Sequence, residues 1–250
     1  MNVTKFTIPE IISGVNSLRY LASCALSSGA KRVLLVSDPG IEEAGWVEQV
    51  MDVLRKSGIS WTYFNDVQSN PRDFHIRDGA RQYLEEEADV IVALGGGSPM
   101  DTAKGIALLA SNGGQVRDYE GANRITRPLP PMIFVPTTAG SGAEISQFAI
   151  ITDLEHQVKM ALISRTLMPN IAIIDPLILQ TKPDWLIIAS AIDALTHAIE
   201  AYLSRISSPF TEINSLKAVE LIMTHLEPAL STHSVEHLAG LSTASTIAGM

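Results

Sequence analysis

A strand-like run that ends in three consecutive glycines constrains the fold of this chain most. Residues 89–94 contain only valine, isoleucine, alanine and leucine after an initial aspartate, and glycines occupy positions 95–97. A helical pattern then covers residues 99–110. A strand without polar alternation is buried on both faces, and a helix directly after it indicates a parallel sheet with helices on both sides.

Further strands and helices alternate through the first 180 residues and then give way to helices alone. Strand patterns cover 33–36, 61–64, 132–135, 147–152, 158–163 and 171–174, and helical patterns cover 46–58 and 79–84. Helical periodicity alone continues over 184–204, 210–226 and 234–250. We therefore predict an α/β fold, with an N-terminal parallel-sheet domain over 1–180. An incomplete all-helical domain follows over 181–250, because the last helical pattern is unfinished at Gly249-Met250.

Composition narrows the class of protein. The net charge of −9 argues against binding of nucleic acid, which needs clustered lysine and arginine. One cysteine, Cys24, excludes an internal disulfide and indicates a reducing compartment, and its apolar neighbours predict a buried thiol. The first six residues lack a secretory signal, and we expect no run near the ~20 apolar residues that span a bilayer. The expected protein is cytoplasmic, with no nucleic acid or membrane as partner.

The glycine loop has the features of a phosphate-binding corner. Glycines let the backbone approach a ligand closely, while Ser98 suits an N-cap and Pro99 the first helical position. Free N–H groups at a helix start attract a pyrophosphate. The alternative is a capped turn without a ligand, and the loop lacks the G-x-G-x-x-G spacing of ordinary Rossmann dehydrogenases.

Two more strand ends are candidates for the same site. Asp38 follows the strand at 33–36, where a carboxylate binds ribose hydroxyls and repels a 2′-phosphate, although aspartate there is also a common turn former. The loop at 136–144 is rich in hydroxyls and glycines, and it is either part of a nucleotide crevice or a flexible connection.

Asp193 and His197 form a candidate metal pair. They are four residues apart in a helical pattern, so their side chains project from one face that is otherwise apolar. Carboxylate and imidazole suit iron or zinc. A hydrogen-bonded pair inside a helical core is the alternative.

Three segments together resemble the signatures of the iron-containing (group III) alcohol dehydrogenase family. They cover residues 95–104, 136–144 and 193–202, in the family's order and separation. The resemblance implies a nucleotide-binding α/β domain, an all-helical domain, NAD and Fe²⁺ (or Zn²⁺) as cofactors, and a small-molecule alcohol or aldehyde as substrate. It implies metal ligation by Asp193 and His197, and nucleotide contacts by Asp38, Asn70, Gly97, Ser98, Asp101, Thr137, Thr138, Ser146, Phe148, Lys159 and Leu179.

The chain departs from the family at the metal. The family's two remaining ligands are histidines beyond the equivalent of Met250, so we expect a C-terminally truncated member that binds NAD and turns over slowly or not at all. His233 and His237 are poor substitutes, since they precede the ligand positions, and His75, His156 and His225 are predicted as surface or capping residues. An unfinished helical domain leaves apolar surface exposed, which favours a homo-oligomer. A glycerol-type polyol dehydrogenase and a non-catalytic NAD-binding or assembly subunit are the alternatives.

Overall fold

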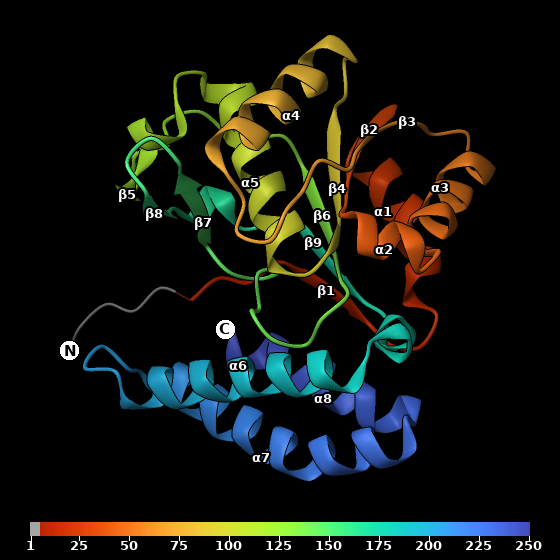
Figure 1. Ribbon diagram of the computed structural model, residues 1–250, viewed down its shortest axis with the longest axis vertical. Helices are drawn as coiled ribbons and strands as arrows, with labels where there is room; N and C mark the ends of the chain where they lie inside the picture. Colours follow the sequence, from red (N-terminus) through yellow and green to blue (C-terminus); the bar gives the residue numbers. More distant parts are fainter. Residues whose placement is uncertain (1–5) are drawn as a thin grey trace.

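The computed structural model describes residues 6–250 and contains a six-stranded parallel sheet (Figure 1). The expectation of no secretory signal rests on the first six residues, and residues 1–5 lie outside the described part. The strand order is β1-β9-β6-β4-β2-β3, and every neighbouring pair is parallel. The strands are β1 (Glu10–Ser13), β2 (Arg32–Val36), β3 (Ser60–Phe64), β4 (Val90–Gly95), β6 (Met132–Pro136) and β9 (Ile171–Ile174).

Helices cover both faces of this sheet, as the apolar strands predict. Alternate residues of one strand enter different cores: Leu35 packs with helices α1 and α3, whereas Leu34 packs with α5. Figure 1 shows α4 and α5 on one side of the sheet and α1 to α3 on the other. Cys24 is buried in α1. The helices are α1 (Leu21–Ser27), α2 (Pro39–Glu43), α3 (Trp46–Lys56), α4 (Asp73–Glu85) and α5 (Gly97–Asn112).

A small three-stranded sheet lies beside α5. Strands β7 (Phe148–Asp153) and β8 (Val158–Ile163) form an antiparallel hairpin, and β5 (Gly121–Ala122) pairs with β8. Buried residues of this hairpin pack on α4 and α5. Single-turn 3₁₀ helices connect the elements: η1 (Ser17–Tyr20), η2 (Val116–Tyr119), η3 (Arg165–Leu167) and the longer η4 (Pro176–Thr181).

The remaining chain is helical, with α6 (Asp184–Leu203), α7 (Pro209–Thr232) and α8 (Val235–Ala248) packed around a shared apolar cluster. Ser208 caps α7 through Thr211, and Pro209 occupies the first turn, where its missing N–H has no consequence. The helix continues past the predicted residue 226 and includes Pro228. Strands end before η4 and only helices follow, while the division into domains near residue 180 stays a prediction.

One helix, α6, meets the length and hydropathy of a membrane span, which the prediction of no such segment did not anticipate. It has 20 residues and a mean hydropathy of 1.4 in its most apolar window, of which 22% is buried. Core helices pass the same test, and α6 packs against α7 and α8 through buried residues such as Ile187 and Ala194. Its opposite face is open, with Ile192 and Ile199 exposed.

Candidate functional site

The glycine corner between β4 and α5 is too tightly packed to hold side chains. A Cβ on Gly95 would collide with the Pro99 ring, and one on Gly96 would lie 3.0 Å from Thr138 Oγ1. A Cβ on Gly97 would lie 3.1 Å from Ser141 Oγ. The corner therefore touches the loop after β6, and glycine is what allows this close approach.

The predicted N-cap role of Ser98 is wrong. The extended backbone of Gly96 (φ −84°, ψ −156°) takes the N-cap position without a side-chain bond, so α5 begins at Gly97. Ser98 therefore lies inside the first turn, whose N–H groups have no partner within the helix. A helix start of this kind attracts an anion.

A cavity of about 610 Å³ opens in front of this corner, at the carboxyl ends of β2, β4 and β6. The predicted residues Asp38, Gly97, Ser98, Thr137 and Thr138 all line it. The remaining wall residues come from the glycine corner, α2 and the residue after it, the segment before α4, and the end of η4 through the first turn of α6: Gly96, Pro99, Pro39, Gly40, Ile41, Ala44, Val67, Gln68, Ser69, Thr181, Lys182, Pro183, Trp185 and Leu186. Crevices at this position in parallel α/β sheets are ligand sites.

Asp38 has both of the roles that its position allows. Its Oδ1 accepts a hydrogen bond from the Ile41 N–H at 3.1 Å and caps α2. Within residues 6–250 its Oδ2 makes no hydrogen bond, and the side chain lines the cavity. One oxygen thus fixes the turn while the other is free for a ligand.

A second, smaller hollow of about 170 Å³ shares Gly97 and Ser98 with the main cavity. Asn70 and Asp101 line it, and Lys159 Nζ donates to Asn70 Oδ1 at 2.8 Å. Asp101 Oδ2 accepts from the Ile150 N–H at 3.1 Å. Burial raises the pKa of Asp101 to about 6, while the Lys104 ammonium opposes this shift. The predicted Asn70, Asp101 and Lys159 therefore lie together.

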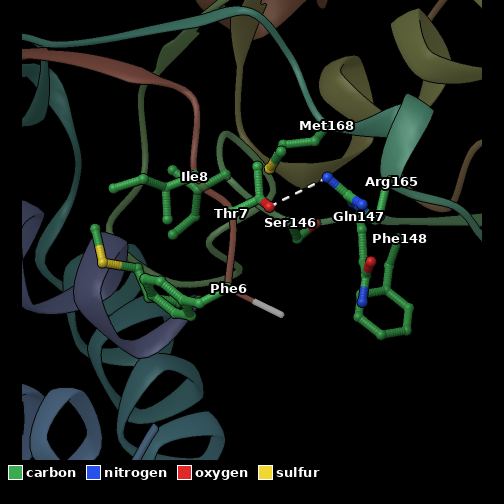
Figure 2. Close-up of a pocket in the computed structure, with 11 residues that line it drawn as sticks. Phe6, Thr7, Ile8, Ser146, Gln147, Phe148, Arg165 and Met168 are labelled. Atoms are coloured by element: carbon green, nitrogen blue, oxygen red, sulfur yellow. Dashed lines mark hydrogen bonds between the residues drawn. The ribbon is translucent and has the colours of Figure 1, made fainter. Parts of the chain in front are cut away.

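Ser146 and Phe148 line a separate hollow, also of about 170 Å³ (Figure 2). It lies between the segment around Thr7 and the turn at Arg165, whose guanidinium donates to Thr7 Oγ1 at 3.3 Å. These two predicted residues are not brought into the main cavity. Leu179 is not brought there either, because its side chain is 4% exposed and packs in the helical core.

Lys104 links these regions, and no role was predicted for it. The side chain is fully buried, and Nζ donates to Ser146 O, Ser146 Oγ and Phe148 O at 3.0, 3.0 and 2.7 Å. Burial lowers the pKa of Lys104 to about 8, against the pull of the Asp101 and Glu144 carboxylates. Lysine is rarely buried, so only its place at the end of the glycine motif singles it out in the sequence.

The loop after β6 also contacts the helical part. A Cβ on Gly140 would lie 2.9 Å from Ser190 Cβ in α6, and one on Gly142 would lie 2.9 Å from Gly249 Cα. Glu144 is buried and accepts from Thr246 Oγ1 at 2.9 Å, and burial raises its pKa. This loop therefore joins the glycine corner to α6 and α8.

The Asp193–His197 pair lies on α6, with His197 Nε2 3.9 Å from Asp193 Oδ1. The side chains are 51% and 42% exposed, so their donor atoms are accessible. Leu186 lines the cavity and Ser190 approaches Gly140. Spacings of four, seven and eleven residues from Leu186 place Ser190 and then the pair on that same helix face.

This donor set fits part of a metal site. Imidazole nitrogen and carboxylate oxygen at this separation bind one iron or zinc ion after a small side-chain movement. Within residues 6–250 no group of three or more histidine, cysteine, aspartate or glutamate side chains is arranged around a common point. The described residues thus offer two candidate ligands there.

The other histidines lie elsewhere. His233 Nε2 is 3.4 Å from Asp184 Oδ1, and His237 Nδ1 is 3.0 Å from His225 Nδ1. His156 is a surface residue beside Asp153, as predicted. The prediction for His75 is wrong: its side chain is 1% exposed, because it lies on the inner face of α4 beside Phe74.

Comparison with known proteins agrees with this geometry. The profile of the family described as iron-containing alcohol dehydrogenase matches residues 9–176, and the profile of its C-terminal part matches residues 187–250. The NAD-dependent methanol dehydrogenase of Bacillus methanolicus is 35% identical over 99% of this chain and 66% of its own length. The 1,3-propanediol dehydrogenase of Klebsiella pneumoniae is 36% identical over 98% of this chain and 64% of its own length.

Solved structures give the same result. A crystal structure of a 1,3-propanediol oxidoreductase has a TM-score of 0.97 at 35% identity, with 99% of this chain and 65% of that chain covered. The alcohol dehydrogenase from Oenococcus oeni has a TM-score of 0.96 at 31% identity, with 99% and 66% covered. The present chain thus spans slightly less than two thirds of the length of these relatives.

Proposed function

Because this chain belongs to the iron-containing alcohol dehydrogenase family, we propose that the protein is an NAD-dependent alcohol oxidoreductase that uses a divalent metal ion. It transfers a hydride between a small primary alcohol, or the corresponding aldehyde, and the nicotinamide. One observation carries the proposal: Leu186, at the start of α6, lines the cavity at the glycine corner, and Asp193 and His197 follow on the same face of that helix. Cofactor and substrate oxygen can therefore lie side by side.

In this proposal, different residues of the cavity bind different parts of the nucleotide. The free Oδ2 of Asp38 accepts hydrogen bonds from the adenosine ribose, and its charge disfavours a 2′-phosphate. The N–H groups at the start of α5 bind the pyrophosphate, beside the hydroxyls of Thr137 and Thr138. The remaining predicted contacts are further from the cavity and act through the adjoining hollows: Asn70, Asp101, Ser146, Phe148 and Lys159. Leu179 is buried in the helical core, so this proposal gives its side chain no contact with the nucleotide.

Asp193 and His197 would hold the metal, with iron favoured by the family and zinc as the alternative. A bound divalent ion supplies Lewis-acid stabilisation of the alkoxide oxygen. The protein's own contribution is to place the reacting carbon near the nicotinamide and to exclude water with the apolar residues of α6.

Calorimetric titration with NAD and metal analysis after anaerobic loading with Fe²⁺ or Zn²⁺ test the proposal. Asp193→Ala and His197→Ala should each lower the bound metal while the affinity for NAD stays unchanged. His156→Ala is the matched control, because His156 also pairs with a carboxylate, 3.1 Å from Asp153 Oδ2, but lies far from α6 in the sequence. Absence of NAD binding by the intact chain would refute the proposal.

A second function, NAD binding with little or no turnover, is favoured by the small donor set. Two protein ligands hold a divalent ion weakly, and the described residues provide no third one at this position. Turnover of a panel of primary alcohols, diols and glycerol at saturating metal separates an alcohol enzyme, a polyol enzyme and a non-catalytic NAD-binding or assembly subunit.

We place the protein in the cytoplasm as a homo-oligomer. The single cysteine is buried, and the exposed faces of α6 and α7 carry apolar side chains such as Leu203, Ile213 and Met223. Contiguous exposed apolar surface favours association between copies. Light scattering behind size-exclusion chromatography measures the oligomeric state.

A further inference from the structure

The main cavity contains one carboxylate and one ammonium group among its lining residues, and only the carboxylate has been given a role. The two groups belong to Asp38 and Lys182. Lys182 lies directly after η4, where the chain passes from the sheet to α6. The neighbouring wall residues are neutral, so Lys182 dominates the positive charge of this cavity.

The backbone holds Lys182 in place. Its N–H donates to Leu179 O at 3.0 Å, and Pro183 follows it. The preceding Thr181 accepts a hydrogen bond from Trp46 Nε1 at 3.0 Å and donates to Ile178 O at 2.9 Å. The start of the side chain is therefore fixed, while its charged end lies on the cavity wall.

The ammonium group lacks a partner of its own. Within residues 6–250 Lys182 Nζ makes no hydrogen bond and no ion pair, although the side chain is partly buried. Lys159, the basic residue of the adjoining hollow, is by contrast engaged with Asn70. Burial lowers the pKa of Lys182, and the negative charge of Asp38 opposes this shift. The two groups therefore interact electrostatically. An anionic ligand would supply the missing partner.

We infer that Lys182 is a further cofactor-binding residue, whose ammonium binds phosphate oxygens of the dinucleotide. Asp38 decides whether the 2′-phosphate of NADP can be among them. This inference rests on the proposed function. In the native protein the Asp38 carboxylate repels a 2′-phosphate, so the Lys182 ammonium binds only the phosphate oxygens that NAD also has. Once Asp38 loses its charge, Lys182 is free to bind a 2′-phosphate, because an ammonium group attracts phosphate as a point charge.

A double-mutant cycle tests the inference with titrations of NADH and NADPH. The variants are Asp38→Asn, Lys182→Met and the double variant. Asparagine is as good an N-cap as aspartate, so α2 is kept, and methionine keeps much of the apolar stem of lysine. Lys31→Met is the matched control, since Lys31 is exposed and directly precedes β2, at the opposite end of that strand.

We expect Lys182→Met to weaken NADH binding about tenfold, which corresponds to the loss of one charge-assisted contact. Lys31→Met should leave NADH binding unchanged. Asp38→Asn should bind NADPH more tightly than the unaltered protein does. The double variant should bind NADPH at least tenfold more weakly than Asp38→Asn. The part of the affinity that depends on Lys182 should shrink as salt is raised.

Equal NADPH affinities of Asp38→Asn and the double variant would overturn the role of Lys182 and leave the proposed function intact. Failure of the unaltered protein to bind either nucleotide would instead overturn both. Circular dichroism of each variant identifies a loss of folding, and Lys182→Gln, which is neutral but polar, then replaces the methionine variant and must show the same loss.

Discussion

The buried ammonium of Lys104 predicts an unusual dependence of stability on pH. Lys104 is fully buried in α5 beneath the 146–148 segment, and the carboxylates that act on it are Asp101 and Glu144. Its pKa falls from 10.5 in the unfolded chain to about 8 in the folded protein. The folded state therefore releases this proton at a lower pH than the unfolded state does.

The sign and size of the effect follow from linkage. Below pH 8 both the folded and the unfolded state carry the proton, so Lys104 does not make the free energy of unfolding depend on pH. Between pH 8 and pH 10.5 the unfolded chain binds more protons, so the free energy of unfolding rises with pH. Each unit of pKa corresponds to about 1.4 kcal/mol, so the shift amounts to about 3 kcal/mol over this interval.

Urea denaturation of the unaltered protein and of Lys104→Met, each at several pH values from 6 to 10.5, measures this contribution. We expect the difference between the two free energies of unfolding to be constant up to pH 7.5 and then to move in favour of the unaltered protein. The same comparison with Lys31→Met, an exposed lysine, should stay flat. A flat difference for Lys104→Met, or one that moves the other way, would refute the account of Lys104 as a desolvated cation.

The remaining predictions concern the glycine corner and the core. Gly95→Ala places a Cβ against the rigid Pro99 ring, so NAD affinity measured by calorimetry should fall at least tenfold, and unchanged affinity would show that the corner can shift freely. Gly79→Ala drives a Cβ into Ile106 and should destabilise the protein by about 1–3 kcal/mol in urea denaturation; addition of Ile106→Val, which removes the colliding Cδ1, should recover part of the loss, and no recovery would contradict the contact. The pKa of Asp101 is raised to about 6 from 3.8, so its contribution to stability is complete below pH 3.8 and is lost as pH rises through 6. Between pH 4 and pH 6 the free energy of unfolding of Asp101→Asn should therefore rise relative to that of the unaltered protein in the same assay. A difference between the two free energies that does not change with pH would contradict the shift.

The sequence predicted every strand of the six-stranded sheet except the edge strand β1. Strands β2, β4, β6 and β9 were predicted because every residue of their cores is apolar, as burial on both faces requires. The edge strand β1 was missed, since it has only four residues, of which the polar Glu10 and Ser13 at its two ends are exposed. The start of α5 was placed two residues late, because glycine is normally a poor helix former.

Sequence reasoning located side chains correctly where local spacing decides their position, and it missed residues whose burial is decided by the tertiary structure. Glycines after an apolar strand predicted the corner, and a carboxylate four residues before an imidazole predicted a pair on one helix face. Lys104 and Lys182 were missed, because nothing in the sequence around a lysine reports whether its ammonium is buried. His75 was also missed: its side chain is buried, although charged residues stand on both sides of the segment 74–76 in the sequence.

The contacts of the loop after β6 decide where this protein can be divided. That loop meets the glycine corner through Gly97 and Ser141, and it meets α6 and α8 through Gly140, Gly142 and Glu144. A hybrid that exchanges the helices of one relative for those of another at residue 181 would join a loop to surfaces that were not shaped for it. Breakpoints for recombination must therefore move this loop together with the helices, although it lies more than thirty residues before them in the sequence.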